Sequence, residues 1–278
     1  MKLYKVKSGI IIENEGNFYS LGNENWDALF NDNELLSKLK KFTLEQEPIE
    51  NGALIIKTEL IAPIQNQEIW ASGVTYYNSK LGRQEESKNS GGGQFYAHVY
   101  DAERPELFFK ATAYRTAGHS GAVRIRRDSD WNVPEPELTL VINSSGKIVG
   151  FTIGNDMSSR SIEGENPLYL PQAKTYDGCA SIGPCIYVTD QPLEKDTKIE
   201  MAIYRGQEKV FNDETSLKQM KRSPEELVSY LYRECSFPFG CFLMTGTGIV
   251  PTSEFTLQKG DEIHITILPI GTLINTVK

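Results

Sequence analysis

Three carboxylates near the middle of the chain have the type and spacing to hold a divalent cation. Glu135 and Glu137 stand in the segment Pro134-Glu135-Pro136-Glu137-Leu138, and Asp156 follows 19 residues after Glu137. A residue that precedes proline favours extended backbone, so both glutamates are predicted to lie on one face of a strand, roughly 6.5 to 7 Å apart. At that distance both carboxylates can reach one ion, and they repel each other without it. Three carboxylates around a divalent cation leave a surplus of one negative charge. Lys174 is predicted to offset that surplus or to carry a proton.

The donor types favour a hard cation. The chain has three histidines, His98, His119 and His264, and none lies within four residues of another. The histidine spacings of zinc proteases and of two-histidine iron sites are therefore absent. Carboxylate oxygens favour Mg²⁺, with Mn²⁺ or Ca²⁺ as alternatives. A solvated strand face is the other interpretation of two glutamates at alternate positions.

These residues need a β-rich scaffold. Residues 138–142, the turn Ser144-Ser145-Gly146 and residues 148–153 predict a hairpin. Further strands are predicted at 70–74, 182–188, 198–204, 210–212, 242–244, 261–268 and 272–277. Ser223, Pro224 and Glu226 are typical of a helix start with a capping box.

Two regions are predicted along the chain. Residues 1–65 alternate short strand patterns with a helical pattern and predict a small N-terminal α/β module, and residues 66–278 predict a catalytic domain. A segment with three consecutive glycines, Gly91 to Gly93, cannot pack a core. It predicts either a surface loop or a flexible lid near 78–100 that orders over a substrate.

Composition excludes several classes of protein. The 278 residues carry a formal net charge of -8, which argues against a nucleic-acid surface. No run approaches the roughly 18 apolar residues of a membrane helix, and the first residues lack a signal-peptide pattern, so a cytoplasmic protein is expected. The four cysteines show no C-x-x-C spacing and are predicted to be reduced thiols in or near the core.

Several segments together resemble the fumarylacetoacetate hydrolase family. They are Trp70 to Tyr76, Arg104 to Lys110, Pro134 to Val141, Gly150 to Arg160, Gln172 to Gly178, Ile182-Gly183-Pro184 and Thr245-Gly246-Thr247-Gly248. The resemblance covers about residues 70 to 278 and implies an α+β, β-rich fold with a mixed β-roll catalytic domain. It also implies that Glu135, Glu137 and Asp156 bind Mg²⁺, that Lys174 contacts the substrate beside the metal, and that Thr247 binds the substrate carboxylate.

One departure bears on the reaction. Many hydrolases of the family carry Gly-x-Asn-Tyr-x-x-His, whose histidine helps to activate water, whereas this chain has Ser79 at the histidine position. Residues 100–112 and 163–172 resemble the branch that contains 2-keto-3-deoxy-D-arabinonate dehydratase. The resemblance thus implies a Mg²⁺-dependent dehydratase, a hydro-lyase that converts a 2-keto-3-deoxy sugar acid, such as 2-keto-3-deoxypentonate, to 2,5-dioxopentanoate through a metal-stabilised enolate.

Two other functions stay open. The first is a C–C bond hydrolase of an acylpyruvate or a 2,4-dioxo-3-deoxy sugar acid, with His119 or Glu106 activating water. The second is a non-catalytic protein that binds a keto acid. In either case the expected partner is a small 2-oxo acid rather than nucleic acid or membrane, and the resemblance suggests a homodimer or homotetramer.

The remaining candidate residues have two interpretations each. Lys174 is predicted to move the C3 proton or to stabilise the enolate. Glu106 is a candidate acid or base, or else pairs with Arg104. Ser72 and Lys110 are candidate substrate contacts, or else bond within the scaffold, and His119 is either a catalytic residue or a solvated turn residue.

Overall fold

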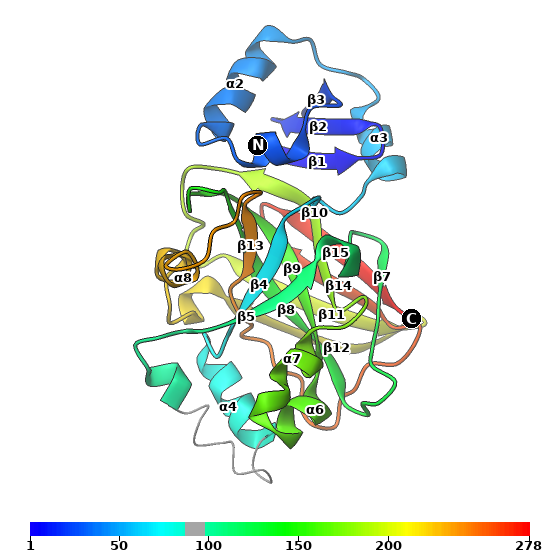
Figure 1. Ribbon diagram of the computed structural model, residues 1–278. Coiled ribbons are helices and arrows are strands. Elements are labelled where there is room, and N and C mark those ends of the chain that lie inside the picture. The colour runs from blue at the N-terminus through cyan, green and yellow to red at the C-terminus, as the bar shows by residue number, and fades with distance from the viewer. Residues whose placement is uncertain (87–97) are drawn as a thin grey trace.

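The computed structural model describes residues 1–86 and 98–278. Two sheets of mixed pairing dominate it (Figure 1), so the predicted β-rich α+β fold is confirmed. The larger sheet has the order β3 (Asn17–Gly22), β2 (Gly9–Asn14), β1 (Lys2–Val6), β10 (Ala180–Val188), β9 (Ile148–Ser159), β8 (Asn132–Ile142), β13 (Cys241–Met244), β4 (Glu68–Gly73) and β5 (Glu106–Thr112), and β6 (Thr116–Ala117) pairs with β10. The smaller sheet has the order β12 (Glu208–Ser216), β11 (Lys198–Arg205), β14 (Glu262–Ile267), β15 (Gly271–Val277) and β7 (Gly121–Val123).

Short helices join and flank these sheets. They are α1 (Trp26–Phe30), α2 (Leu35–Glu45), α3 (Gly52–Glu59), α4 (Tyr77–Glu86), α6 (Arg160–Glu165), α7 (Leu170–Lys174) and α8 (Pro224–Leu231), with 3-10 turns at η1 (Ala113–Arg115), η2 (Pro167–Tyr169) and η3 (Leu217–Gln219). The predicted start of α8 is confirmed, because the Ser223 side chain accepts a hydrogen bond from the backbone N–H of Glu226. Among the described residues, none of the helices combines the length and the hydrophobicity that a membrane span requires.

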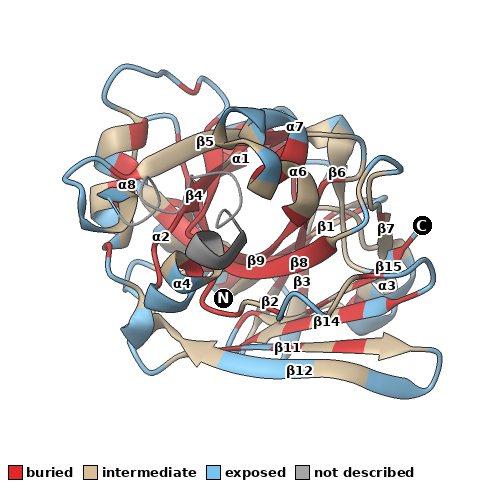
Figure 2. Cartoon of the chain, turned by 90° about the horizontal axis from the view of Figure 1, so that it is seen from below, coloured by how far each residue is buried: buried red, intermediate tan, exposed pale blue. Residues whose placement is uncertain are grey.

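The β8–β9 hairpin is the centre of the fold. All of β8 and nearly all of β9 are buried, and both strands are red in Figure 2. Side chains alternate between the two faces of a strand, so Leu138 and Leu140 pack into a core shared with Ile203 and Ile265 of the smaller sheet. The opposite face carries Glu135 and Glu137. One face of the hairpin therefore fixes the scaffold, and the other is left for polar groups.

The N-terminal strands extend the larger sheet. β1 pairs with β10 in the register Leu3 to Ile186, and the rings of Phe30 and Phe242 pack 5.1 Å apart. A domain boundary near residue 65 stays a prediction. The lid predicted near 78–100 begins in α4, but residues 87–97 lie outside the described residues.

The four cysteines differ in access to solvent. Cys179, Cys185 and Cys241 are buried, whereas Cys235 is exposed, so the prediction of a core position is wrong for Cys235. Burial raises the pKa of the Cys185 thiol to about 12, and burial also raises the pKa of Cys241 well above its usual value. Thiolate is the reactive form, so Cys185 and Cys241 lack both access and ionisation, and Cys179 lacks access.

We therefore expect one fast-reacting thiol in the native protein and four after unfolding. An Ellman assay at pH 8, with and without denaturant, measures both numbers. Cys235→Ser should remove the fast phase. Rapid native labelling of that variant would contradict the burial of the other three thiols.

Candidate metal centre

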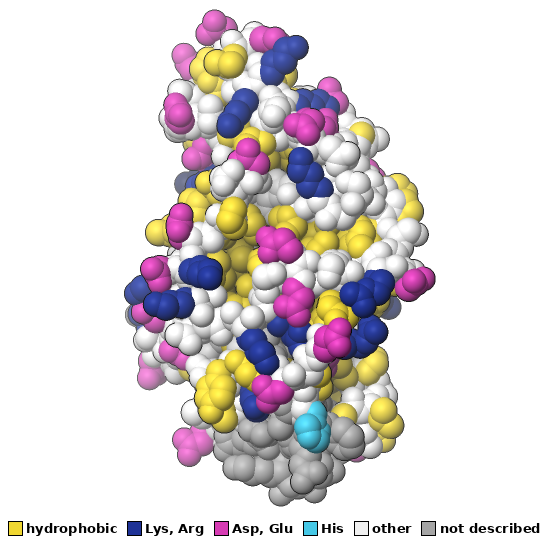
Figure 3. Space-filling model, turned by 90° about the vertical axis from the view of Figure 1, so that its left-hand side faces the viewer, with side chains coloured by type: hydrophobic (Ala, Val, Ile, Leu, Met, Phe, Trp, Pro, Cys, Tyr) yellow, Lys and Arg dark blue, Asp and Glu magenta, His cyan; other side chains and the backbone are white. Residues whose placement is uncertain are grey.

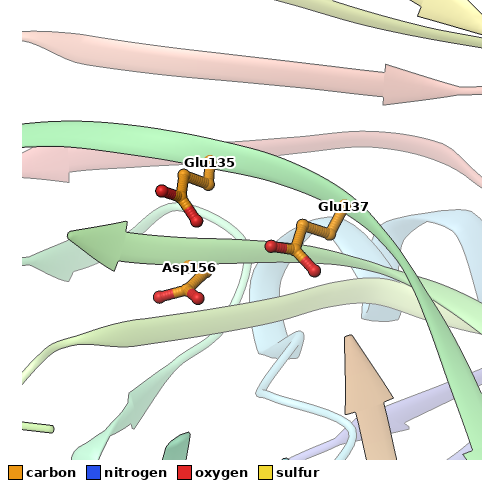
Figure 4. Close-up of side chains that lie close together, drawn as sticks. All are labelled: Glu135, Glu137 and Asp156. Carbon is orange, nitrogen blue, oxygen red and sulfur yellow. The ribbon is translucent and has the colours of Figure 1, made fainter. Parts of the chain in front are cut away.

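Pairing between β8 and β9 brings the three carboxylates together. Glu135 lies directly opposite Asp156, and Glu137 lies opposite Gly154. One oxygen from each carboxylate lies within 4.8 Å of the others, and Figure 4 shows all three side chains pointing into the same space. Glu135 is 4% exposed, Glu137 1% and Asp156 0%. The predicted clustering of two glutamates on one strand face is thus present, and Asp156 joins them across the hairpin.

The electrostatics of this cluster fit a divalent cation. Burial, followed by the charges of Asp156 and Glu135, raises the pKa of Glu137 well above its usual value. The cost of ionising Glu137 here is the cost that a bound cation would remove, and three carboxylate oxygens are donors that Mg²⁺ prefers. The backbone N–H of Gly246 donates to Glu137 Oε2 and orients that carboxylate.

Lys174 lies at the end of α7 and contacts two of the three carboxylates. Its Nζ donates to Glu135 Oε2 at 2.6 Å, to Asp156 Oδ2 at 3.2 Å and to Ser158 Oγ at 2.6 Å. An ammonium group has three donors, and all three are used. The structure therefore places Lys174 inside the centre, buried and held in one position.

Lys110 of β5 approaches Asp156 from the other side. Its Nζ lies 2.6 Å from Asp156 Oδ1, and it donates to the carbonyl oxygens of Met157, at 2.9 Å, and Lys174. Burial raises the pKa of Asp156, but the ammonium groups of Lys110 and Lys174 outweigh this effect and hold it below its usual value. Lys110 thus ties β5, β9 and α7 together at the carboxylates.

Arg160 is a member of the centre that the sequence analysis did not identify. Its Nη2 donates to Glu135 Oε1 at 2.7 Å, and its Nε lies 4.0 Å from Glu163 Oε2. Arg160 begins α6 directly after β9, so its position four residues beyond Asp156 is the signal that was available. Two lysines and one arginine balance the three ligand carboxylates. A bound divalent cation would make the centre positive, even with Glu163 included, which favours an anionic substrate.

The turn after β13 closes one side of the centre. Gly246 has a φ of +91°, a conformation that favours glycine, and a Cβ there would lie 2.0 Å from Thr75 Oγ1. Thr247 is buried, and its Oγ1 bonds the backbone of Ile249. Thr247 is thus adjacent to the residue that orients Glu137.

Ser72 and Glu106 lie at the paired ends of β4 and β5. Ser72 Oγ donates to the carbonyl oxygen of Glu106 at 3.1 Å. A Cβ on Gly73 would lie 2.0 Å from Glu106 Oε2, so the carboxylate of Glu106 covers the backbone of Gly73. The Ser72 carbonyl also approaches Gly246, within 2.9 Å of the Cβ that glycine lacks. Ser72 therefore borders the turn that contacts Glu137, and Glu106 covers the next residue of β4.

The side chain of His119 has its described neighbours in the smaller sheet and not at the carboxylate centre. Burial lowers its pKa, a hydrogen bond with the backbone of Thr272 opposes that shift, and His264 adds to it. Both of these neighbours belong to the smaller sheet. None of the contacts described for His119 reaches the carboxylates, so the structure gives no support to water activation by His119.

A separate cavity of about 710 Å³ opens between α8 and the loop after β10. Its lining includes Leu193, Met220 and Val228 but none of the predicted site residues. Figure 3 views the molecule from the side of α8 and shows hydrophobic side chains gathered below the N-terminal strands. Its volume alone does not make this cavity the reaction site, because the three clustered carboxylates do not line it.

Comparisons with known proteins agree with the resemblance noted in the sequence. A family model described as fumarylacetoacetate (FAA) hydrolase, C-terminal, matches residues 75–278. A probable 2-keto-3-deoxyxylonate dehydratase of Haloferax volcanii is 52% identical over 217 residues, which cover 77% of this chain and 73% of that protein. The 2-dehydro-3-deoxy-D-arabinonate dehydratase of Saccharolobus solfataricus is 44% identical over 220 residues, which cover 78% of this chain and 73% of that protein.

Solved structures agree as well. One of 2-keto-3-deoxy-D-arabinonate dehydratase, complexed with magnesium and 2,5-dioxopentanoate, has a TM-score of 0.84 at 34% identity. The match covers 100% of this chain and 99% of that one. On the family match, the two relatives and this structural similarity, the chain belongs to the fumarylacetoacetate hydrolase family.

Proposed function

We propose that this protein is a magnesium-dependent dehydratase that removes water from a 2-keto-3-deoxypentonate and yields 2,5-dioxopentanoate. The buried cluster of Glu135, Glu137 and Asp156, surrounded by Lys110, Lys174 and Arg160, carries the proposal. Relatives named as dehydratases of such acids, at 52% and 44% identity, support the choice of substrate class.

The ligand residues and Lys174 are proposed to have different roles in the reaction. Glu135, Glu137 and Asp156 would hold a divalent cation, which would supply the Lewis acidity that polarises the C2 carbonyl of a 2-oxo acid and makes its C3 protons more acidic. Lys174 is fixed by three oxygen acceptors, an arrangement that suits an ammonium group. We assign it to stabilising the negative charge that develops on the substrate when the C3 proton leaves.

Glu106 is proposed as the acid–base group. Its carboxylate borders Gly73, beside the turn that orients Glu137. A carboxylate there can accept the C3 proton and return it to the C4 oxygen as the C4–O bond breaks. The products of this step are water and 5-hydroxy-2-oxopent-3-enoate. Loss of a proton from C5 and gain of one at C3 then give an enol, which tautomerises to the aldehyde of 2,5-dioxopentanoate. Ser72 borders the turn at residues 245–248, and Thr247 belongs to that turn. Both are proposed to contact the substrate carboxylate.

Incubation with Mg²⁺ and stereoisomeric 2-keto-3-deoxypentonates tests the function. We expect one isomer to lose water, detected by mass spectrometry and by appearance of an aldehyde. The active-site variant Glu137→Gln should leave the substrate intact in parallel samples. If the whole panel stays intact with wild-type protein and Mg²⁺, dehydration of these acids is the wrong assignment.

Metal removal should act on both stability and rate. Treatment with a chelator is expected to abolish turnover and to lower the melting temperature, because the cation offsets repulsion among buried carboxylates. At a Mg²⁺ concentration 100 times its dissociation constant, the folded state should gain about 2.7 kcal/mol. Differential scanning fluorimetry across a Mg²⁺ titration measures this gain. A melting temperature independent of Mg²⁺ and of chelator would contradict a metal centre.

A cytoplasmic location and a homodimer or homotetramer remain proposals drawn from the sequence. Light scattering coupled to size-exclusion chromatography measures the assembly directly.

A further inference from the structure

Tyr76 is a buried residue that the proposed reaction does not use. It follows β4 by three residues, and its neighbour Thr75 donates from Oγ1 to the carbonyl oxygen of Thr245 at 2.6 Å. The Tyr76 ring packs on the same turn, since a Cβ on Gly248 would lie 2.6 Å from the ring atom Cδ1. This turn also contains Gly246, whose N–H holds Glu137. The turn at residues 245–248 therefore contacts both the Tyr76 ring and Glu137.

The hydroxyl of Tyr76 lacks a hydrogen-bond partner within residues 1–86 and 98–278. The side chain is 0% exposed, and buried hydroxyl groups normally have a partner. Burial, followed by the charge of Glu137, raises the pKa of Tyr76. The hydroxyl is thus neutral at physiological pH and, as far as the described residues show, available as a donor.

We propose that Tyr76 is a substrate-binding residue whose hydroxyl donates a hydrogen bond to an anionic oxygen of the bound 2-oxo acid, on the Glu137 side of the centre. The inference rests on the proposed function. A neutral donor bonds most strongly to an ionised acceptor, and the carboxylate or the developing enolate oxygen of such a substrate is that acceptor. The bond forms only with the ligand, so it contributes to ligand affinity and not to the stability of the unliganded protein.

The variant Tyr76→Phe separates a contribution to ligand affinity from a contribution to the stability of the unliganded protein. Oxalate with Mg²⁺ is the probe, because it presents two adjacent anionic oxygens like those of a 2-oxo acid enolate. We expect the variant to melt at or above the wild-type temperature without ligand and to bind Mg²⁺ with an affinity within about twofold of wild type. Its affinity for oxalate, measured calorimetrically at saturating Mg²⁺, should fall by about 10- to 100-fold, the range for a hydrogen bond to a charged group. The kcat/KM for the 2-keto-3-deoxy acid should fall by a similar factor.

Tyr232→Phe is the matched control. Its hydroxyl donates to the carbonyl oxygen of Asn143 at 2.9 Å, a bond that exists without ligand. This variant should melt below wild type and bind oxalate normally. The proposal is overturned if Tyr76→Phe binds oxalate as wild type does, or if its unliganded melting temperature falls as in Tyr232→Phe. If wild-type protein with Mg²⁺ fails to bind oxalate, the proposed function itself is contradicted and the role of Tyr76 falls with it.

Discussion

Glu137→Gln is expected to lower Mg²⁺ affinity and turnover by more than about 100-fold, since even groups that only orient metal ligands cost about 10- to 100-fold when lost. The same change should not destabilise the metal-free protein. Burial and two neighbouring carboxylates raise the pKa of Glu137, which means that the ionised form is disfavoured in the fold. A neutral amide of nearly the same shape removes that penalty and can still accept from the Gly246 N–H.

The sign of this effect can be followed with pH. A group whose pKa is raised on folding contributes stability at low pH and loses it as pH rises through the folded pKa. The metal-free variant should therefore match wild type below the ordinary carboxyl pKa of 4.5 and become the more stable protein as pH increases. Calorimetric Mg²⁺ binding and urea denaturation at several pH values measure both outcomes.

Glu214→Gln is the control for this experiment. Glu214 pairs with Lys198 at 2.7 Å on the surface, where its side chain is 56% exposed. We expect its Mg²⁺ affinity and rate to stay within about twofold of wild type, because exposed pairs contribute little. Wild-type Mg²⁺ affinity in Glu137→Gln would show that this carboxylate is not a ligand.

Lys174→Met is expected to cost about 3–5 kcal/mol of stability in the metal-free protein, the range for removing one partner of a buried ion pair. Lys174 contacts Glu135 and Asp156 with a side chain only 1% exposed. Without it, Arg160 and Lys110 are the cationic partners that the described part of the chain leaves to these carboxylates. Added Mg²⁺ should restore part of the lost stability but not the activity, because the cation can offset the carboxylate charge while the positive charge that stabilises the substrate anion is gone.

Lys198→Met tests whether burial is the reason for the large loss of stability expected in Lys174→Met. Its ammonium group lies 2.7 Å from Glu214, but its side chain is 59% exposed, so the loss should be about 0–1 kcal/mol. Urea denaturation of both variants gives the comparison. Equal losses in the two variants would contradict the importance assigned to the buried network.

Local sequence patterns predicted part of this centre. The prolines beside Glu135 and Glu137 predicted extended backbone there, and the turn at Ser144-Ser145-Gly146 predicted the hairpin. Both predictions depend on residues that are close in sequence. The pairing of Glu135 with Asp156 could not be counted from the turn, since a bulge shifts the register between Val141 and Ile142. Asp156 was proposed as the third carboxylate from its residue type and place in the sequence, and the family resemblance, which retains long-range information, also implied that it binds the metal.

The cationic surroundings were harder to predict. Lys110 comes from a strand that is separated from β9 in the sheet by β8, β13 and β4, and its bonds to Met157 and Lys174 arise only from tertiary folding. Arg160 stood within a recognised motif, but its contact with Glu135 depends on the start of α6. No role was predicted for Tyr76, because a tyrosine directly after a strand is usually a core residue.

The pairing of β1 with β10 has a consequence for work with shortened chains. Ala180 of β10 pairs with Asp156, so β10 supports the ligand strand β9. The other edge of β10 pairs with β6 at Ala180 and Ser181 and with β1 at Ile186 and Tyr187. Cutting the chain near residue 65 would expose unpaired backbone groups of β10 at Ile186 to Val188, an edge to which other molecules can add. A fragment beginning at residue 66 should therefore self-associate into larger particles, and constraint on the metal-binding hairpin would weaken even though every ligand is still encoded.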